Sequence, residues 1–196
     1  MDALPAKTLL DYFRHAVGSG KPDLLVSKVS GAWTPVSAQE LGRKTRGFGI
    51  GLTTLGVDHD DRVAILSENR PEWPMADFGT LGIGAITVPI YTTYLAPQVE
   101  YILRDCGAKV LFVSNEHELA KVMEVRGRCP SLAHVVVVEG RVPNADGLHS
   151  FEGVVQRGEE VLRRQPGAWD ERVAHVTPES HATIIYTSGT TGEPKG

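Results

Sequence analysis

The chain has 196 residues, of which 41% are hydrophobic and 22% charged, and its net charge is −4 from 20 basic and 24 acidic side chains. This composition is typical of a globular protein and excludes a disordered chain. A slightly acidic net charge gives no sign of the basic surface that nucleic acids require, so we expect no nucleic-acid partner. The two cysteines, Cys106 and Cys129, form no C-x-x-C pair and the histidines form no ligand cluster, which predicts buried reduced thiols and no structural zinc.

The N-terminus lacks the charged region and apolar core of a signal peptide. The longest mostly apolar run, residues 78–90, is interrupted by three glycines and a proline and is too short to cross a bilayer. A cytoplasmic protein without a transmembrane segment is therefore expected. Peripheral attachment to a membrane and a homodimer both stay open.

The first part of the chain predicts two helices and a hairpin. Helical spacing of apolar residues indicates a helix over 7–17, and two short apolar runs around a Ser-Gly turn indicate a β-hairpin over 24–36. Ser37 and Glu40 have the spacing of a capping box, which predicts a helix over 37–55.

The next part alternates between short apolar runs and helical patterns. Strands are predicted over 62–66, 85–89, 109–113, 134–138 and 182–186, and helices over 71–82, from Pro97 onward, over 116–126 and over 151–164. The strands are continuous apolar runs, as expected when helices cover both faces of a parallel sheet. The predicted fold class is α/β, a mostly parallel sheet flanked by helices with a small β-hairpin near the start.

Polar residues at two predicted strand ends are weaker site candidates. Asn69 and Arg70 follow a strand at the carboxyl edge of the sheet, where ligands bind in α/β folds. For Asn69 we favour a capping role on the helix that begins at Pro71. The Tyr91–Thr93 segment follows the next strand and can either shape a cleft or serve only as a loop.

Three other features have structural explanations. Glycines 47, 49 and 51 hint at a dinucleotide fingerprint but lie within a predicted helix, so close helix packing explains them better. Gly56 is the expected stop of that helix. His181 is expected to be exposed, and Arg163–Arg164 to form a solvated helix face.

The chain ends in a loop of glycines, hydroxyl residues and one lysine, Tyr-Thr-Ser-Gly-Thr-Thr-Gly-Glu-Pro-Lys-Gly at 186–196. Glycines allow backbone amides to converge on an anion, hydroxyls donate further hydrogen bonds, and Lys195 adds a charge that suits a polyphosphate. The segment is neither a Walker A loop nor a G-x-S-x-G nucleophile elbow. Its composition alone also fits a polar surface loop.

The whole segment resembles the phosphate-loop signature of the adenylate-forming superfamily at every defined position. Ser67-Glu-Asn-Arg-Pro-Glu-Trp73 and Val88-Pro-Ile-Tyr-Thr-Thr93 look like the long-chain fatty acid–CoA ligase branch of that superfamily. The resemblance covers about residues 33–196. It implies that a fatty acid reacts with ATP to give acyl-AMP, which CoA then converts to acyl-CoA.

The resemblance also implies residue roles and a domain position. It assigns binding of the ATP phosphates to Thr187, Ser188, Gly189, Thr190, Thr191, Gly192 and Lys195. Among these, Lys195 becomes the catalytic residue and Thr187 a ligand of Mg²⁺. Residues 1–196 correspond to the N-terminal part of the large AMP-binding domain, without its C-terminal remainder and small lid domain, so this chain alone is expected to be inactive. The open alternatives are a ligase for another carboxylic acid and a non-catalytic nucleotide-binding module.

Overall fold

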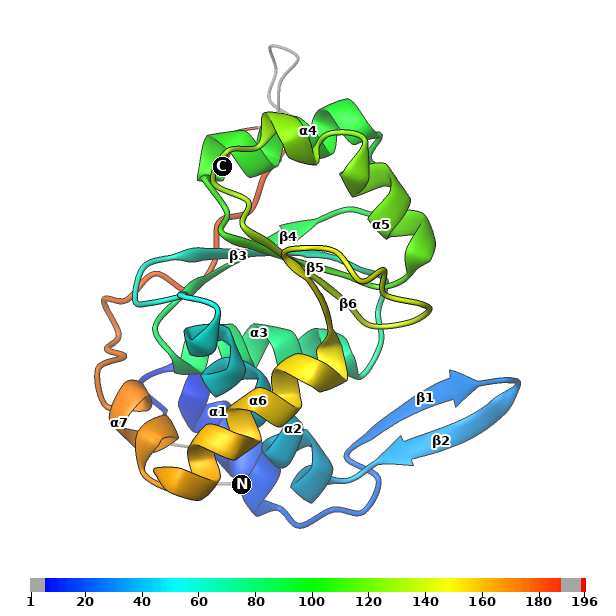
Figure 1. The fold of residues 1–196 in the computed structure, drawn as a ribbon. Helices are drawn as coiled ribbons and strands as arrows, with labels where there is room; N and C mark the ends of the chain where they lie inside the picture. The colour runs from blue at the N-terminus through cyan, green and yellow to red at the C-terminus, as the bar shows by residue number, and fades with distance from the viewer. Residues whose placement is uncertain (1–5, 188–194) are drawn as a thin grey trace.

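The computed structural model describes residues 6–187 and 195–196, which form a sheet between two layers of helices with a hairpin at one side (Figure 1). The elements, in chain order, are α1 Leu9–Gly18, β1 Leu25–Val29, β2 Ala32–Val36, α2 Ala38–Thr54, β3 Arg62–Leu66, α3 Glu72–Gly82, β4 Ile86–Ile90, α4 Ala96–Cys106, β5 Val110–Val113, α5 Glu116–Met123, the 3₁₀ turn η1 Arg126–Arg128, β6 His134–Val137, β7 Leu148–Ser150, α6 Phe151–Arg164 and α7 Ala168–Val173.

The five-stranded sheet is parallel throughout and has the order β4-β3-β5-β6-β7. Helices α1, α2, α3, α6 and α7 cover one face, and α4 and α5 cover the other (Figure 1). Each face has its own apolar core, because successive strand residues point to opposite sides: Val63 and Ile65 face the first layer, Ala64 and Leu66 the second. The strand order reverses between β3 and β5, which makes the carboxyl ends of these strands the topological switch point.

The glycines of α2 allow it to pack very closely on α6 and α3, as expected. A Cβ atom at Gly51 would lie 2.2 Å from the carbonyl oxygen of Val154, and one at Gly158 would lie 1.8 Å from that of Gly47. A Cβ at Gly49 would lie 2.5 Å from the carbonyl oxygen of Gly79. The predicted role of these glycines in helix packing is therefore confirmed, and the dinucleotide fingerprint is excluded by their place within a helix.

The helix-end signals are confirmed in part. The Ser37 hydroxyl accepts a hydrogen bond from the Glu40 amide at 3.1 Å, whereas the Glu40 carboxylate lies 3.6 Å from Lys44 Nζ. Gly56 follows α2 with a φ of +79°, as a helix stop requires. The capping role predicted for Asn69 is wrong: Pro71 occupies the N-cap of α3, and no side chain caps that helix.

The predicted strand over 182–186 is also wrong. Only Thr183 forms a bridge, a parallel one with Thr87, through hydrogen bonds that join Thr87 to Ala182 and Ile184. The next residue of β4 that faces this edge is Pro89, which has no N–H to donate, so the pairing ends there. Two elements had no clear sequence signal, the short strand β7 and the short helix α7.

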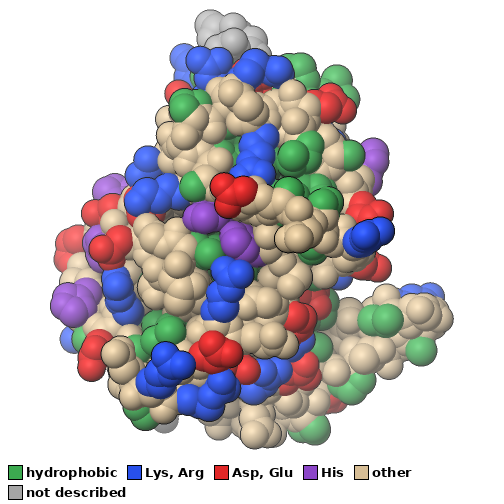
Figure 2. All heavy atoms as spheres, in the orientation of Figure 1, with side chains coloured by type: hydrophobic (Ala, Val, Ile, Leu, Met, Phe, Trp, Pro, Cys, Tyr) green, Lys and Arg blue, Asp and Glu red, His purple; other side chains and the backbone are tan. Residues whose placement is uncertain are grey.

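The expectations for the two cysteines and for three exposed side chains are borne out. Cys106 and Cys129 are free and buried. Within the described part of the chain, no helix is long and apolar enough to cross a membrane. The main body of the face in Figure 2 shows acidic and basic side chains interspersed, in line with the balanced composition. His181, Arg163 and Arg164 are exposed, as predicted.

Candidate functional site

The two ends of the terminal motif are paired with each other. Thr187 and Lys195 form an antiparallel bridge, with Thr187 N donating to Lys195 O at 3.1 Å and Lys195 N donating to Thr187 O at 3.0 Å. Both residues are exposed. The other predicted phosphate-binding residues lie outside the described residues: Ser188, Gly189, Thr190, Thr191 and Gly192.

Tyr186 anchors the base of this motif to the end of α4. Its ring is buried, and its hydroxyl donates a hydrogen bond to the carboxylate of Asp105. Burial, followed by this carboxylate, raises the pKa of Tyr186, so the phenol stays protonated. Arg62, the first residue of β3, donates to the carbonyl of Gly107 at 3.2 Å, which places this end of α4 at the amino edge of the sheet.

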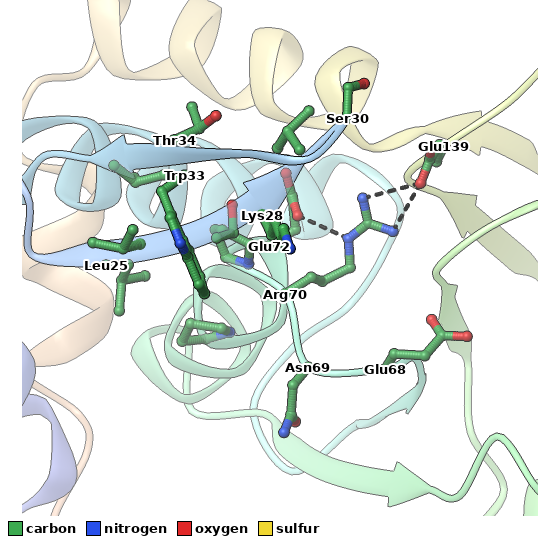
Figure 3. Close-up of a pocket in the computed structure, with 16 residues that line it drawn as sticks. Leu25, Lys28, Ser30, Trp33, Thr34, Glu68, Asn69, Arg70, Glu72 and Glu139 are labelled. Atoms are coloured by element: carbon green, nitrogen blue, oxygen red, sulfur yellow. Dashed lines mark hydrogen bonds and ion pairs between the residues drawn. The ribbon is translucent and has the colours of Figure 1, made fainter.

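A groove with a volume of about 840 Å³ lies at the opposite, carboxyl edge, between the β1–β2 hairpin and the loop after β3. Trp33, which is 70% exposed, extends from the hairpin toward this loop, and Arg70 lies between Glu72 and Glu139 (Figure 3). Asn69 also lines the groove. This is the switch point of the sheet, where open α/β sheets bind ligands.

Arg70 joins the carboxyl ends of three strands. Its Nε lies 2.8 Å from Glu72 Oε2, and its Nη1 donates to the carbonyl of Ser114 after β5 at 3.1 Å. The same nitrogen lies 3.4 Å from the carboxylate of Glu139 after β6. Two carboxylates therefore neutralise this guanidinium, which fits a structural role better than anion binding. The sequence pointed to Arg70 by its place after a strand, but it gave no signal for Glu139 or Ser114 as its partners.

The Tyr91–Thr93 segment is held at the same edge by a second charged group. Lys121 of α5 donates to the carbonyl of Thr92 at 2.7 Å and lies 2.8 Å from the carboxylate of Glu118, which is buried. Tyr91 is 64% exposed and packs edge-on against Tyr94, with ring centroids 5.6 Å apart. The structure thus fixes the backbone of this loop and leaves the Tyr91 ring largely exposed.

The structure does not bring the candidate residues into one site. Asn69, Arg70 and the Tyr91–Thr93 loop share the carboxyl edge, whereas Thr187 and its partner Lys195 follow Tyr186, which is hydrogen-bonded to Asp105 at the end of α4. This separation follows from the single bridge at Thr183, because a full parallel strand would carry the motif to the carboxyl edge.

The described residues do not complete a Mg²⁺ site. Mg²⁺ takes six oxygen ligands and is usually held by carboxylates together with substrate phosphates. Thr187 supplies a single hydroxyl, and within residues 6–187 and 195–196 no three histidine, cysteine, aspartate or glutamate side chains are arranged to hold a metal ion. The ligand role predicted for Thr187 fits only an ion that takes its other ligands from ATP, from water and from further residues.

The sequence matches a known family over most of its length. The sequence profile of a family described as AMP-binding enzyme covers residues 13–196. The long-chain-fatty-acid–CoA ligase FadD15 of Mycobacterium bovis is 39% identical over 177 residues, which are 89% of this chain and 28% of that protein. The long-chain-fatty-acid–CoA ligase ACSBG2 of Xenopus laevis is 30% identical over 99% of this chain and 26% of its own length. The chain therefore spans between a quarter and a third of these relatives.

Solved structures share the fold. The anthranilate CoA ligase AuaEII, solved with anthranoyl-AMP, superimposes with a TM-score of 0.67 at 32% identity over 83% of this chain and 29% of its own. A long-chain-fatty-acid–CoA ligase, FadD1 of Archaeoglobus fulgidus, superimposes with a TM-score of 0.76 at 22% identity over 99% of this chain and 36% of its own. The predicted α/β architecture is thereby confirmed.

Proposed function

We propose that this chain carries the ATP-phosphate loop of an AMP-forming long-chain fatty acid–CoA ligase. The proposal starts from the family, because the chain belongs to the AMP-binding enzymes. The proposed enzyme is cytoplasmic and converts a fatty acid, ATP and CoA to acyl-CoA through acyl-AMP. The observation that carries the proposal is the segment Tyr186–Gly196, which has the full phosphate-loop pattern. The relatives named as long-chain-fatty-acid–CoA ligases support the choice of acid.

The chemistry needs positive charge and hydrogen-bond donors around the departing pyrophosphate. When the fatty acid carboxylate attacks the α-phosphorus of ATP, negative charge builds up on the β- and γ-phosphates. In the proposal the Lys195 ammonium and the hydroxyls of Thr190 and Thr191 donate to these oxygens. Glycines 189 and 192 let the backbone approach them. Mg²⁺, when bound, would neutralise phosphate charge, and Thr187 would contribute one of its ligands.

The remaining groups of the reaction are proposed to lie outside this chain. Residues 1–196 then form the N-terminal part of the large AMP-binding domain. The relatives are more than three times longer, which leaves room for a carboxylate that binds the metal, an adenosine site and a CoA site. We therefore expect no ATP–pyrophosphate exchange by the 196-residue chain alone, and measurable exchange would contradict this division of the site.

The test uses a polypeptide that contains this chain and extends to the length of its relatives. Lys195→Ala should slow formation of acyl-AMP at least tenfold and leave acyl transfer from preformed acyl-AMP to CoA nearly unchanged, because pyrophosphate leaves only in the first step. Lys21→Ala, at an exposed loop position, is the matched control and should change neither step. Equal losses in both half-reactions would argue against a phosphate-binding role for Lys195.

A second candidate is a ligase for an aromatic acid. It is favoured by the anthranilate CoA ligase, which is 32% identical over 83% of the chain. A carboxylate panel that includes long-chain fatty acids, benzoate and anthranilate separates the two candidates by the acyl-CoA products formed. If none of these acids yields a product, a non-catalytic nucleotide-binding module becomes the better explanation.

A further inference from the structure

Two histidines form a direct pair at the amino side of the sheet, away from the groove. His134 is the first residue of β6, and His149 is the central residue of β7. Because Val136 is the parallel partner of His149, and residues 134 and 136 share a face, both rings lie on the face that α2 and α6 cover. Nδ1 of His134 and Nε2 of His149 are 3.1 Å apart, and the ring centroids are 5.1 Å apart.

The pair links β6 to β7 and lies beside the end of α2. The backbone of Leu55, at the C-terminal end of α2, interacts with the His134 ring and favours its protonated form. If the N–H of His134 faces Leu55, its other nitrogen, Nδ1, carries the lone pair and accepts from the Nε2–H of His149. The contacts thus run from the end of α2 through β6 to β7. β7 is the edge strand, and its last residue, Ser150, caps α6 by accepting from the Gly153 amide at 3.1 Å.

Protonation affects the hydrogen bond between the two rings in two steps. A first proton can enter at Nδ1 of His149, because that atom is not part of the bond between the rings. The resulting positive charge makes His149 a stronger hydrogen-bond donor. A second proton must enter at Nδ1 of His134. Both nitrogens of the pair then carry hydrogens that point at each other, and the bond between the rings breaks.

The surroundings oppose this second proton. Burial is the main cause that lowers the pKa of both His134 and His149, and Arg126 of η1 and Arg157 of α6 lower both further. Asp146, in the loop before β7, acts in the opposite direction. Arg126 is held in place by the carbonyls of Ala133 and Asp146, at 2.9 and 3.2 Å. Figure 2 shows histidine side chains next to basic ones near the middle of this face.

We propose that the His134–His149 pair is a proton-sensitive clamp that holds the edge strand β7 and the end of α2 against β6 near neutral pH and releases them in acid. Both histidines have folded-state pKa values below the usual 6.5, so the unfolded chain binds more protons in the range just below pH 6.5. The stability that the clamp contributes is therefore complete above about pH 6.5 and is lost as the pH falls through 6.5 toward the folded-state values.

The decisive experiment compares the wild-type chain with the variant H134N/H149Q. The Asn carbonyl takes the place of Nδ1 and the Gln amide that of Nε2–H, so the variant keeps a hydrogen bond that cannot titrate. Native-state hydrogen exchange at the amides of β6 and β7 is measured at pH 7.5 and 5.5 and corrected for the intrinsic rate. Wild-type protection should be lower at pH 5.5 than at pH 7.5, because the opened strands bind protons that the closed pair excludes, whereas protection of the variant should stay constant. H117Q removes an exposed histidine and should behave like wild type.

The same pH-dependent loss in H134N/H149Q as in wild type would overturn the proposal. If that variant does not fold, an NMR titration of the imidazole groups in the wild-type chain decides. The clamp requires two coupled titrations, both below pH 6.5, and the loss of the hydrogen-bonded ring N–H signal in the second. Two independent rings with ordinary pKa values would exclude it.

Discussion

Replacing Gly158 with alanine should weaken the fold through a single methyl group. The new Cβ would lie 1.8 Å from the carbonyl oxygen of Gly47, and ordinary contact begins at 3.4 Å. The α2 and α6 backbones must therefore separate by about 1.6 Å at this crossing, which loosens the contact between the tilted rings of Phe48 and Phe151. Overpacking of a core costs about 3 kcal/mol at the upper end of its usual range, and alanine recovers about 1 kcal/mol of helix propensity. We expect a net loss of about 2 kcal/mol.

Urea unfolding followed by circular dichroism measures this loss. A decrease of about 2 kcal/mol corresponds to a fall in the midpoint of roughly 1 M urea and in the melting temperature of about 4–8 °C for a chain of this size. Gly18→Ala is the matched control. That glycine is also helical, and a Cβ there meets nothing within 4 Å, so the control should be neutral or slightly stabilising. A Gly158→Ala chain as stable as wild type would refute the close-packing argument.

Two more predictions concern groups whose surroundings the structure defines. Arg70→Met should lower the free energy of unfolding by about 1–2 kcal/mol in urea, because it leaves the carbonyl of Ser114 without its donor and removes a partner from two carboxylates. Arg70→Lys should restore less than half of the lost stability, since an ammonium cannot reach all three of these partners. An unchanged midpoint for Arg70→Met would contradict this role. Burial is the main cause that raises the pKa of the Cys106 thiol to about 11, so iodoacetamide at pH 8 should alkylate this thiol only after unfolding. Mass spectrometry of the folded and the urea-treated chain measures the labelling. Rapid labelling of Cys106 in the folded chain would contradict this prediction.

Most of the fold could be read from the sequence because its signals are local. The strand Arg62–Leu66 and the helix Phe151–Arg164 have the predicted bounds, since each is a long apolar or amphipathic pattern between clear breaks. Glycines 47, 49 and 51 also indicated close packing, because few other reasons place three glycines along one helix. By contrast, β7 has three residues and α7 has six, too few to display a period.

The partners of the strand-end residues could not be read in the same way. Arg70 and Glu139 are 69 positions apart, and His134 and His149 meet only because β7 joins the edge of the sheet. No local pattern encodes such contacts, because they depend on strand order and register. The capping role assigned to Asn69 failed for a related reason: the spacing allowed a cap, but Pro71 took the N-cap position itself.

The strand that failed to form is the one that leads into the phosphate-loop motif. Its apolar run predicts a strand, yet pairing with the edge of β4 requires backbone N–H donors on both segments, and Pro89 removes one of these donors. The segment then leaves the edge at Ile184, and the hydrogen bond from Tyr186 to Asp105 holds it against α4. A neighbouring strand on the outer side of residues 182–186 would supply the pairing that β4 cannot. With such a strand in place, residues 182–186 would run parallel to β4 and Thr187 would lie at the carboxyl edge beside the end of β4. The course of residues 184–187 in this chain is thus set by a missing backbone donor, whereas the proposed chemistry of the motif rests on its glycines, hydroxyls and lysine.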